Sequence, residues 1–357
     1  MRSIFYLLSL VLILCSCQDD ESSDHKQETN RPYKMGFSTW SFGPELADLE
    51  ATYQFISSNA DIYSEQVDNK IPWNAYIDNQ PPPEPLVTDI NARVARRLAN
   101  HNLMLSVSLL NLDRTGLLEG FDGTTPYVAT MDDPLIIKAY SDHLLYLLDL
   151  LQPDYLVMAM EVNELMIHDP MLWTEYLSLM KAVRANIKAK YPNLKTSESV
   201  TLHNWYGKDA AIDEAITNFV NQQDFAAISF YPFFVGLHTA ADFQRAFDFL
   251  HERVTVPIAF VETNHLAEDL VIPNLSVDIS SNETEQANYL TSLLQNAEEH
   301  SYPFVIWWGH RDYDALWETF PEEVKDVGQI WRDTGLLDEN GNERPAYQVW
   351  VEALDFE

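Results

Sequence analysis

Short apolar runs alternate with segments of helical length along most of the chain, and this alternation limits the possible folds more than any other feature. Several of the runs are apolar throughout, as in strands that are covered on both faces. The strand candidates are Met35–Trp40, Asp61–Glu65, Leu103–Leu110, Tyr155–Met160, Ser197–His203, Phe225–Tyr231, Pro257–Glu262 and Pro303–Trp308. The helix candidates are Leu46–Ser58, Asp89–Asn100, Pro134–Leu151, Met171–Lys190, Asp209–Asn221, Ala240–Arg253, Glu283–His300 and Pro345–Ala353. A β-then-α unit repeated eight times predicts an α/β fold, a single (β/α)₈ TIM barrel.

Polar and aromatic side chains gather at the C-terminal ends of these strands, where barrel enzymes carry their active sites. Glutamate is rarely buried, so a buried strand followed by Glu161 and Glu164 indicates a site rather than core. The strand-end residues are Trp40, Glu65, Glu161, Glu164, His203, Asn204, Trp205, Tyr231, Glu262, Thr263, Asn264, His265, Trp307 and Trp308.

Two of these glutamates fit one kind of chemistry. Glu164 follows the fourth strand and Glu262 ends the seventh, which places them on opposite sides of a barrel mouth. Glycoside hydrolysis needs such a pair, because one carboxylic acid protonates the leaving oxygen while a carboxylate attacks or assists at the anomeric carbon. Their surroundings must also separate their pKa values.

Five segments, in order, resemble those of glycoside hydrolase clan A, the retaining (β/α)₈ glycosidases. They are Asn163-Glu164, Val261-Glu262, Ser229–Phe233, Val305–Trp308 and the closing stretch Gly335–Tyr347. The resemblance implies that Glu262 is the nucleophile and Glu164 the acid/base. It also implies that Asn163 holds a sugar hydroxyl, that Tyr231 hydrogen-bonds the nucleophile and that Trp308 forms the floor of the sugar site.

Within the clan, the chain most resembles the endo-β-1,4-galactanases of glycoside hydrolase family 53. Leu202-His203, Phe230-Tyr231-Pro232 and Val261-Glu262-Thr263 match their motifs, whereas Val162 replaces a glycine and Leu165 follows Glu164 where Ile-Asn is usual. The resemblance implies a β-linked, galactan-like substrate.

The other strand-end residues have two interpretations. Trp40, Trp205 and His203 are either substrate contacts or core residues, and we predict that they contact the sugar. On an extended chain Glu161 and Glu164 point to opposite faces, so Glu161 is expected to be a supporting charge or a rim residue.

No metal-ligand spacing and no phosphate-binding loop is present, so we predict neither a metal nor a cofactor. A carbohydrate-binding protein on an inactive barrel, or a transglycosylase, are the alternatives.

The N-terminus predicts export. Arg2 precedes the apolar stretch Ile4–Leu14, which has the length of a signal-peptide core, and Leu14–Cys17 resembles a bacterial lipobox with Cys17 as the lipidated residue. We therefore expect a signal peptide at 1–17, a polar tether at 18–32 and a catalytic domain at 33–357, anchored by lipid in the bacterial cell envelope, on the outer-membrane surface. An ordinary cleaved signal peptide is the alternative.

The net charge of the chain excludes some classes of binding partner. With 55 acidic against 22 basic residues, the formal net charge is −33. Such a field repels nucleic acid and anionic glycans, so we expect a neutral polysaccharide or oligosaccharide as the substrate and no nucleic-acid partner. The oligomeric state is not predicted by any feature of the sequence.

The lipobox gives a first testable prediction. If Cys17 carries the lipid, Cys17→Ala releases the protein from the membrane fraction or blocks its maturation, because stable attachment needs the acyl chains. Fractionation followed by immunoblotting measures this, with Cys15→Ala as the control. An unchanged distribution of Cys17→Ala contradicts the assignment.

Overall fold

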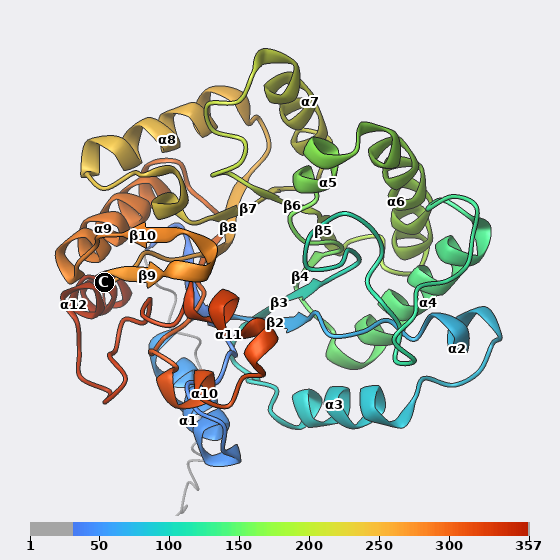
Figure 1. Ribbon diagram of the computed structural model, residues 1–357, viewed down its shortest axis with the longest axis horizontal. Coiled ribbons are helices and arrows are strands. Elements are labelled where there is room, and N and C mark those ends of the chain that lie inside the picture. The colour runs from blue at the N-terminus through green and yellow to red at the C-terminus, as the bar shows by residue number, and fades with distance from the viewer. Residues whose placement is uncertain (1–30, 356–357) are drawn as a thin grey trace, which may run out of the picture.

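Parallel strands close into a ring in the computed structural model, which describes residues 31–355 (Figure 1). The predicted signal peptide and Cys17 lie outside the described residues. The strand order is β5-β4-β3-β2-β1-β11-β8-β7-β6. The strands are β1 (Lys34–Ser38), β2 (Ile62–Val67), β3 (Asn102–Val107), β4 (Tyr155–Val157), β5 (Lys195–Ser197), β6 (Ser199–Thr201), β7 (Ala226–Phe230), β8 (Ile258–Thr263) and β11 (Phe304–Trp307). Every predicted strand is present, and the predicted (β/α)₈ barrel is confirmed.

The fifth barrel strand is divided in two. β5 pairs with β4 and β6 pairs with β7, so the two halves together close the ring. The residue between them, Glu198, is buried. Its carboxylate accepts a hydrogen bond from the Tyr176 hydroxyl at 2.5 Å and pairs with Arg184. The break therefore directs a charged side chain toward the outer helices, where it has partners.

Helices cover the outside of the ring (Figure 1). The main ones are α1 (Leu46–Asn59), α3 (Glu84–Ala95), α4 (Pro134–Leu151), α6 (Pro170–Lys190), α7 (Ala210–Val220), α8 (Ala240–Arg253), α9 (Glu283–Glu299) and α12 (Pro345–Leu354). The shorter elements are α2 (Trp73–Ile77), α5 (Asn163–His168), α10 (Asp314–Trp317), α11 (Glu322–Gln329) and the hairpin β9 (Leu270–Ile272) and β10 (Val277–Ile279). Within residues 31–355 no helix is both long and apolar enough to cross a membrane.

Capping residues fix where several helices begin. The Asp169 carboxylate accepts hydrogen bonds from the backbone N–H groups of Met171 and Leu172, and Pro170 occupies the first helical position of α6. Asp209 and Asn282 accept bonds from the first turns of α7 and α9 in the same way. Such caps satisfy N–H groups that have no partner within the helix, which explains why the sequence predicted the helix starts closely.

Side chains alternate between the inside of the barrel and the layer beneath the helices, as strand geometry requires. The inner group is small and apolar and contains Ile62, Met104, Val157, Phe225, Ala227, Ala259, Val261, Phe304 and Ile306. The outer group is larger and joins strands to helices. On β2 this alternation sends Ser64 and Gln66 inward and Glu65 outward, where Glu65 pairs with Arg93.

A β-bulge interrupts the alternation near the end of β8. Ile228 and Ser229 of β7 are consecutive, yet their partners on β8 are Phe260 and Glu262, so Val261 is an extra residue. The pairing of β8 with β11 shifts at the same place. Phe260 packs in the outer layer, and without the bulge Glu262, two residues on, would also point outward. The bulge instead turns Glu262 into the mouth of the barrel, and Thr263 points outward to Tyr289 of α9.

Close contact between β1 and β2 makes Gly36 a sensitive position. A Cβ atom there would lie 2.1 Å from the Ile62 carbonyl oxygen, so the strands would have to separate. We expect Gly36→Ala to lower the free energy of unfolding by about 2 kcal/mol or more. Gly116→Ala is the matched control, because a Cβ there meets no atom within 4 Å. Denaturant unfolding of both variants measures the difference, and equal stability would contradict the expectation.

Candidate active site

Glu262 lies at the barrel mouth among neutral hydrogen-bond donors. The Tyr231 hydroxyl donates to one carboxyl oxygen, and Gln66 Nε2 donates to the other at 2.7 Å. Tyr231 follows β7 and is buried, and Gln66 belongs to β2. The hydrogen bond from Tyr231 to Glu262 is the one that the sequence predicted.

Glu161 is the second carboxyl of this site. It follows β4 with a backbone φ of 56°, in the left-handed region, which non-glycine residues adopt mainly at functional or strained positions. Its carboxylate pairs with Arg114 Nη2 at 2.7 Å and accepts a hydrogen bond from Ser229 Oγ at 2.9 Å. Because Ser229 is on β7, the Glu161 carboxyl extends across the mouth toward the strand next to β8.

The charges of the two carboxyls interact. Burial and the negative charge of Glu161 raise the pKa of Glu262 to about 7, against the hydrogen bonds from Tyr231 and Gln66. Burial also opposes the ionisation of Glu161, but Arg114, His203 and the Ser229 hydroxyl together outweigh it and lower the pKa of Glu161 below its ordinary value. Two such groups titrate as a pair. Near neutral pH the pair shares one proton, which this arrangement places on Glu262.

The sequence led us to expect Glu164 opposite Glu262. In the structure the carboxyl that acts on Glu262 is that of Glu161. Glu164 lies in the first turn of α5, where its carboxylate accepts hydrogen bonds from Thr201 Oγ1 and, at 2.8 Å, from Asn204 Nδ2. The expectation rested on the match of Asn163-Glu164 to the clan's fourth-strand motif, which puts that glutamate at the end of the strand. The chain instead turns at Glu161 and enters a helix at Asn163, which redirects Glu164 toward the end of β6.

Two predicted substrate contacts are parts of the core. Asn163 is buried, and its amide binds the backbone and hydroxyl of Thr201, which joins α5 to β6. Trp205 is fully buried, and its Nε1 donates to Asp213 of α7 at 2.8 Å. Neither side chain has a free polar group for a sugar, so geometry does not support either substrate-binding prediction.

The other predicted contacts lie near the carboxyl pair. Trp308 Nε1 donates to Gln66 Oε1 at 3.4 Å, and the Trp308 ring centroid is 5.1 Å from that of Trp40. His203 is buried, and its Nδ1 accepts a hydrogen bond from the Tyr231 backbone N–H. Burial lowers the pKa of His203, so its imidazole is neutral at pH 7.

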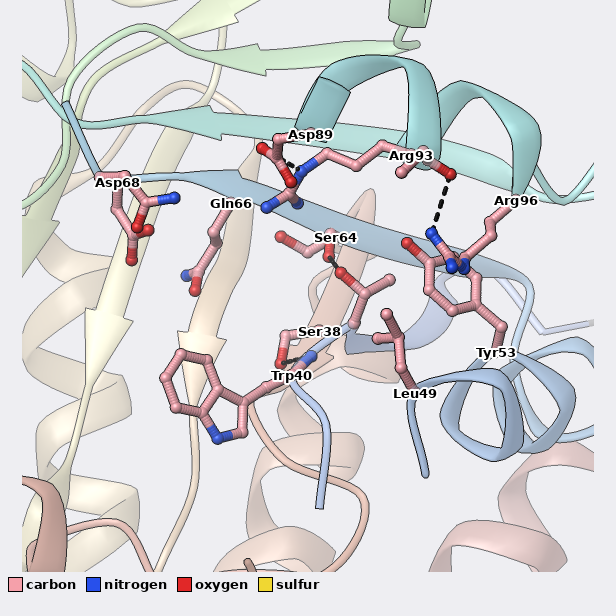
Figure 2. A pocket seen from close by; sticks show the side chains of 13 residues that line it. Ser38, Trp40, Leu49, Tyr53, Ser64, Gln66, Asp68, Asp89, Arg93 and Arg96 are labelled. Carbon is pink, nitrogen blue, oxygen red and sulfur yellow. Dashed lines mark hydrogen bonds and ion pairs between the residues drawn. The ribbon is translucent and has the colours of Figure 1, made fainter. Parts of the chain in front are cut away.

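A cavity of about 190 Å³ adjoins this group between the ends of β1 and β2 and the helices α1 and α3. Trp40 and Gln66 form one side of it, and Tyr53, Arg93 and Arg96 lie on the opposite side (Figure 2). Gln66 therefore connects the cavity to Glu262. The cavity has both an aromatic ring and hydrogen-bonding groups, as a sugar-binding space requires.

Sequence reasoning missed Gln66, Ser229 and Arg114. Gln66 and Ser229 occupy positions of their strands whose side chains point into the barrel, and the alternation of apolar residues could have revealed this direction. Arg114 lies in an irregular loop at φ 55°, and no periodicity predicts where its side chain goes.

Within residues 31–355 two acidic groups have carboxylate oxygens within 4.8 Å of one another, and they share Asp312: one contains Glu268 and Glu339, the other Asp314 and Asp333. The second group is the more buried. Burial raises the pKa of Asp312 to about 8, while Arg344 opposes the shift. Arg344 and Arg332 pair with these carboxylates. The arginines already balance the charges, so the group is explained by packing of the closing segment.

A (β/α)₈ barrel with two interacting carboxyls at its C-terminal mouth is the class that the fold and site define. No family model matches the chain, and a search of the curated proteins found no match. Solved structures are similar to it. The GH53 catalytic domain of Ignisphaera aggregans matches with 17% identity over 86% of this chain and 88% of that one, at a TM-score of 0.54.

Two further structures are similar over most of their length. A GH5_18 protein from Bifidobacterium longum subsp. longum matches with 14% identity over 90% of this chain and 78% of that chain, at a TM-score of 0.64. A fungal β-1,4-galactanase matches with 14% identity over 90% of this chain and 94% of that chain, at a TM-score of 0.57. At these identities the likeness establishes the barrel fold.

Proposed function

We propose that the chain is a retaining glycoside hydrolase that cleaves a β-linked glycan. The observation that carries the proposal is the half-buried pair of Glu161 and Glu262, whose charges interact at the barrel mouth beside Trp308 and Trp40. The similarity to a GH53 catalytic domain and to a fungal β-1,4-galactanase supports it.

The proposed reaction has two halves, the formation and the hydrolysis of a glycosyl ester, and both carboxyls act in each half. Once the shared proton is on Glu161, the Glu262 carboxylate attacks the anomeric carbon and forms a glycosyl ester, while Glu161 gives that proton to the departing glycosidic oxygen. Glu161 then accepts a proton from water as the water oxygen attacks the anomeric carbon, and the Glu262 carboxylate leaves. Tyr231 and Gln66 hold Glu262 in position through its two oxygens.

The proposal moves the acid/base role from Glu164 to Glu161. Glu161 has the carboxyl that interacts with Glu262, whereas Glu164 is held by Thr201 and Asn204. In this scheme Glu164 supports the loop after β6, and Trp308, Trp40, Tyr231 and His203 surround the sugar.

Substrate and location complete the proposal. We assign a neutral, galactan-like polysaccharide or oligosaccharide as the substrate, and lipid attachment through Cys17 at the bacterial cell surface as the location. The cations of this region support a neutral substrate, because carboxylates already engage them: Arg114 pairs with Glu161, Arg93 with Glu65 and Asp89, and Arg96 with Glu50.

Variants of the three glutamates test the mechanism. Glu262→Gln and Glu161→Gln should each lower kcat/KM on the natural glycan by roughly 10²–10⁴-fold or more, the range typical of positioned acid–base groups. Glu161→Gln should lose much less on an aryl glycoside, because a good leaving group needs little protonation. Steady-state kinetics measures both effects, and proton NMR of the first product should show the β anomer.

Glu164→Gln is the matched control, because it removes a carboxylate three residues away that does not adjoin Glu262. We expect its rates to stay within about tenfold of the unmodified enzyme, the effect of roughly 1.4 kcal/mol in the barrier. If Glu164→Gln instead shows the selective loss on poor leaving groups and Glu161→Gln does not, the acid/base is Glu164.

The charge balance gives a prediction about the substrate. A panel of purified glycans should show hydrolysis of a neutral β-glycan such as a β-galactan, and little hydrolysis of pectate, alginate or a highly sulfated polymer, since the net charge of −33 repels them. Reducing-sugar release at low and high salt measures this. A strongly anionic best substrate with salt-insensitive turnover would contradict it.

A further inference from the structure

The proposed mechanism gives no task to Arg114, although its guanidinium lies against the proposed acid. Arg114 Nη2 is 2.7 Å from Glu161 Oε2, and Nη1 donates to the backbone carbonyl of Asn111 at 3.0 Å. Only 14% of the side chain is exposed. An ion pair this close favours the ionised carboxylate, whereas an acid has to carry a proton at the start of the reaction.

The position of Arg114 is costly to maintain. Its backbone φ of 55° is left-handed, which costs about 1–3 kcal/mol for a residue other than glycine. Its Nε is buried and has no hydrogen-bond partner, which adds a desolvation cost. Glu161 is also left-handed. Strain in both partners of one ion pair indicates that the contact itself has a role.

The groups that face Glu161 come from every side of the mouth. They are Arg114 from the loop after β3, His203 from the loop after β6, Ser229 and Tyr231 from the β7 segment, and Glu262 from β8. Glu164 of α5 acts on His203. His203 is neutral at pH 7 because burial lowers its pKa. Arg114 is therefore the cation of this set that opposes the two glutamates.

We propose that Arg114 is a positioning residue, which determines where the proton shared by Glu161 and Glu262 resides and thereby sets the pH range in which the enzyme is active. This inference rests on the proposed function. Its guanidinium stabilises the Glu161 carboxylate more than that of Glu262, because it contacts Glu161 directly. The proton therefore rests on Glu262 until a glycan weakens the ion pair.

Loss of the positive charge should raise both pKa values of the pair. Arg114 favours the ionised forms of Glu161 and of Glu262, so without it both carboxyls keep their protons to higher pH. The enzyme needs one proton on the pair. Both limbs of its pH profile should therefore move to higher pH in a variant that lacks the charge.

The experiment compares Arg114→Met and Arg114→Gln with Arg114→Lys, which keeps the charge. In the two neutral variants we expect the upper limb of log kcat/KM against pH to shift to higher pH by about one unit. This is the lower end of the effect that an adjacent charge has on a pKa. In Arg114→Lys, which keeps the positive charge, the upper limb should lie close to its pH in the unmodified enzyme. Arg253→Met is the matched control, since Arg253 at the end of α8 forms a comparable ion pair, with Asp213 at 2.8 Å, away from the barrel mouth.

A second measurement keeps this inference separate from the proposed function. The ¹³C chemical shift of glutamate carboxyl carbons, assigned with Glu161→Gln and Glu262→Gln, reports their titration without any substrate. In one outcome, Arg114→Met raises the titration midpoint of Glu161, but neither the unmodified protein nor any variant hydrolyses a glycan. The inference about the shared proton is then supported and the hydrolase proposal fails. If hydrolysis depends on both glutamates but Arg114→Met only lowers the rate, with limbs and titrations unchanged, Arg114 has a structural role and this inference fails.

Discussion

Two carboxyls buried close together cannot both be ionised cheaply, and the arrangement of the barrel mouth depends on this constraint. A buried charge has lost its hydration, so it requires donors or an opposite charge. Glu262 has two neutral donors, Tyr231 and Gln66, and Glu161 has Arg114 and Ser229. These partners come from β2, β7 and the loop after β3, so most of the ring takes part in holding one shared proton.

The geometry that brings the pair together departs from regular structure at two points. The bulge at Val261 turns Glu262 inward against the alternation of β8. The left-handed turn at Glu161 lies between β4, which ends at Val157, and α5, which begins at Asn163. Regular strands alone would leave the Glu262 carboxyl beneath the helices, where Phe260 packs. Both irregularities lie next to the barrel mouth, the place where such features commonly aim a functional side chain.

The sequence predicted the fold well because the barrel depends on properties that repeat: apolar runs, helix caps and the order of the elements. The resemblance to the clan also implied the hydrogen bond between Tyr231 and Glu262 that the structure contains, although strand alternation alone would not have turned Glu262 inward. The match of Asn163-Glu164 to the clan's fourth-strand motif placed the second carboxyl on Glu164, and neither that match nor strand periodicity can detect a turn at one residue. Trp205 and Asn163 were expected in the cleft for a similar reason, as the segments after the strands bend back into the core. Arg114 could not be placed, because an irregular loop offers no period from which to infer direction.

The start of the described chain is fastened to the end of the barrel that faces away from the carboxyl pair. Arg31 donates hydrogen bonds to the backbone carbonyls of Ala353 and Leu354 beyond the middle of α12, and it pairs with Asp61, which directly precedes β2. The catalytic groups lie at the opposite, C-terminal ends of the strands. A tether that leaves the domain at residue 31 therefore departs from its base. If the chain is anchored through Cys17, the attachment lies at the end of the barrel opposite the mouth, and it leaves the approach of a long glycan chain to the carboxyl pair open.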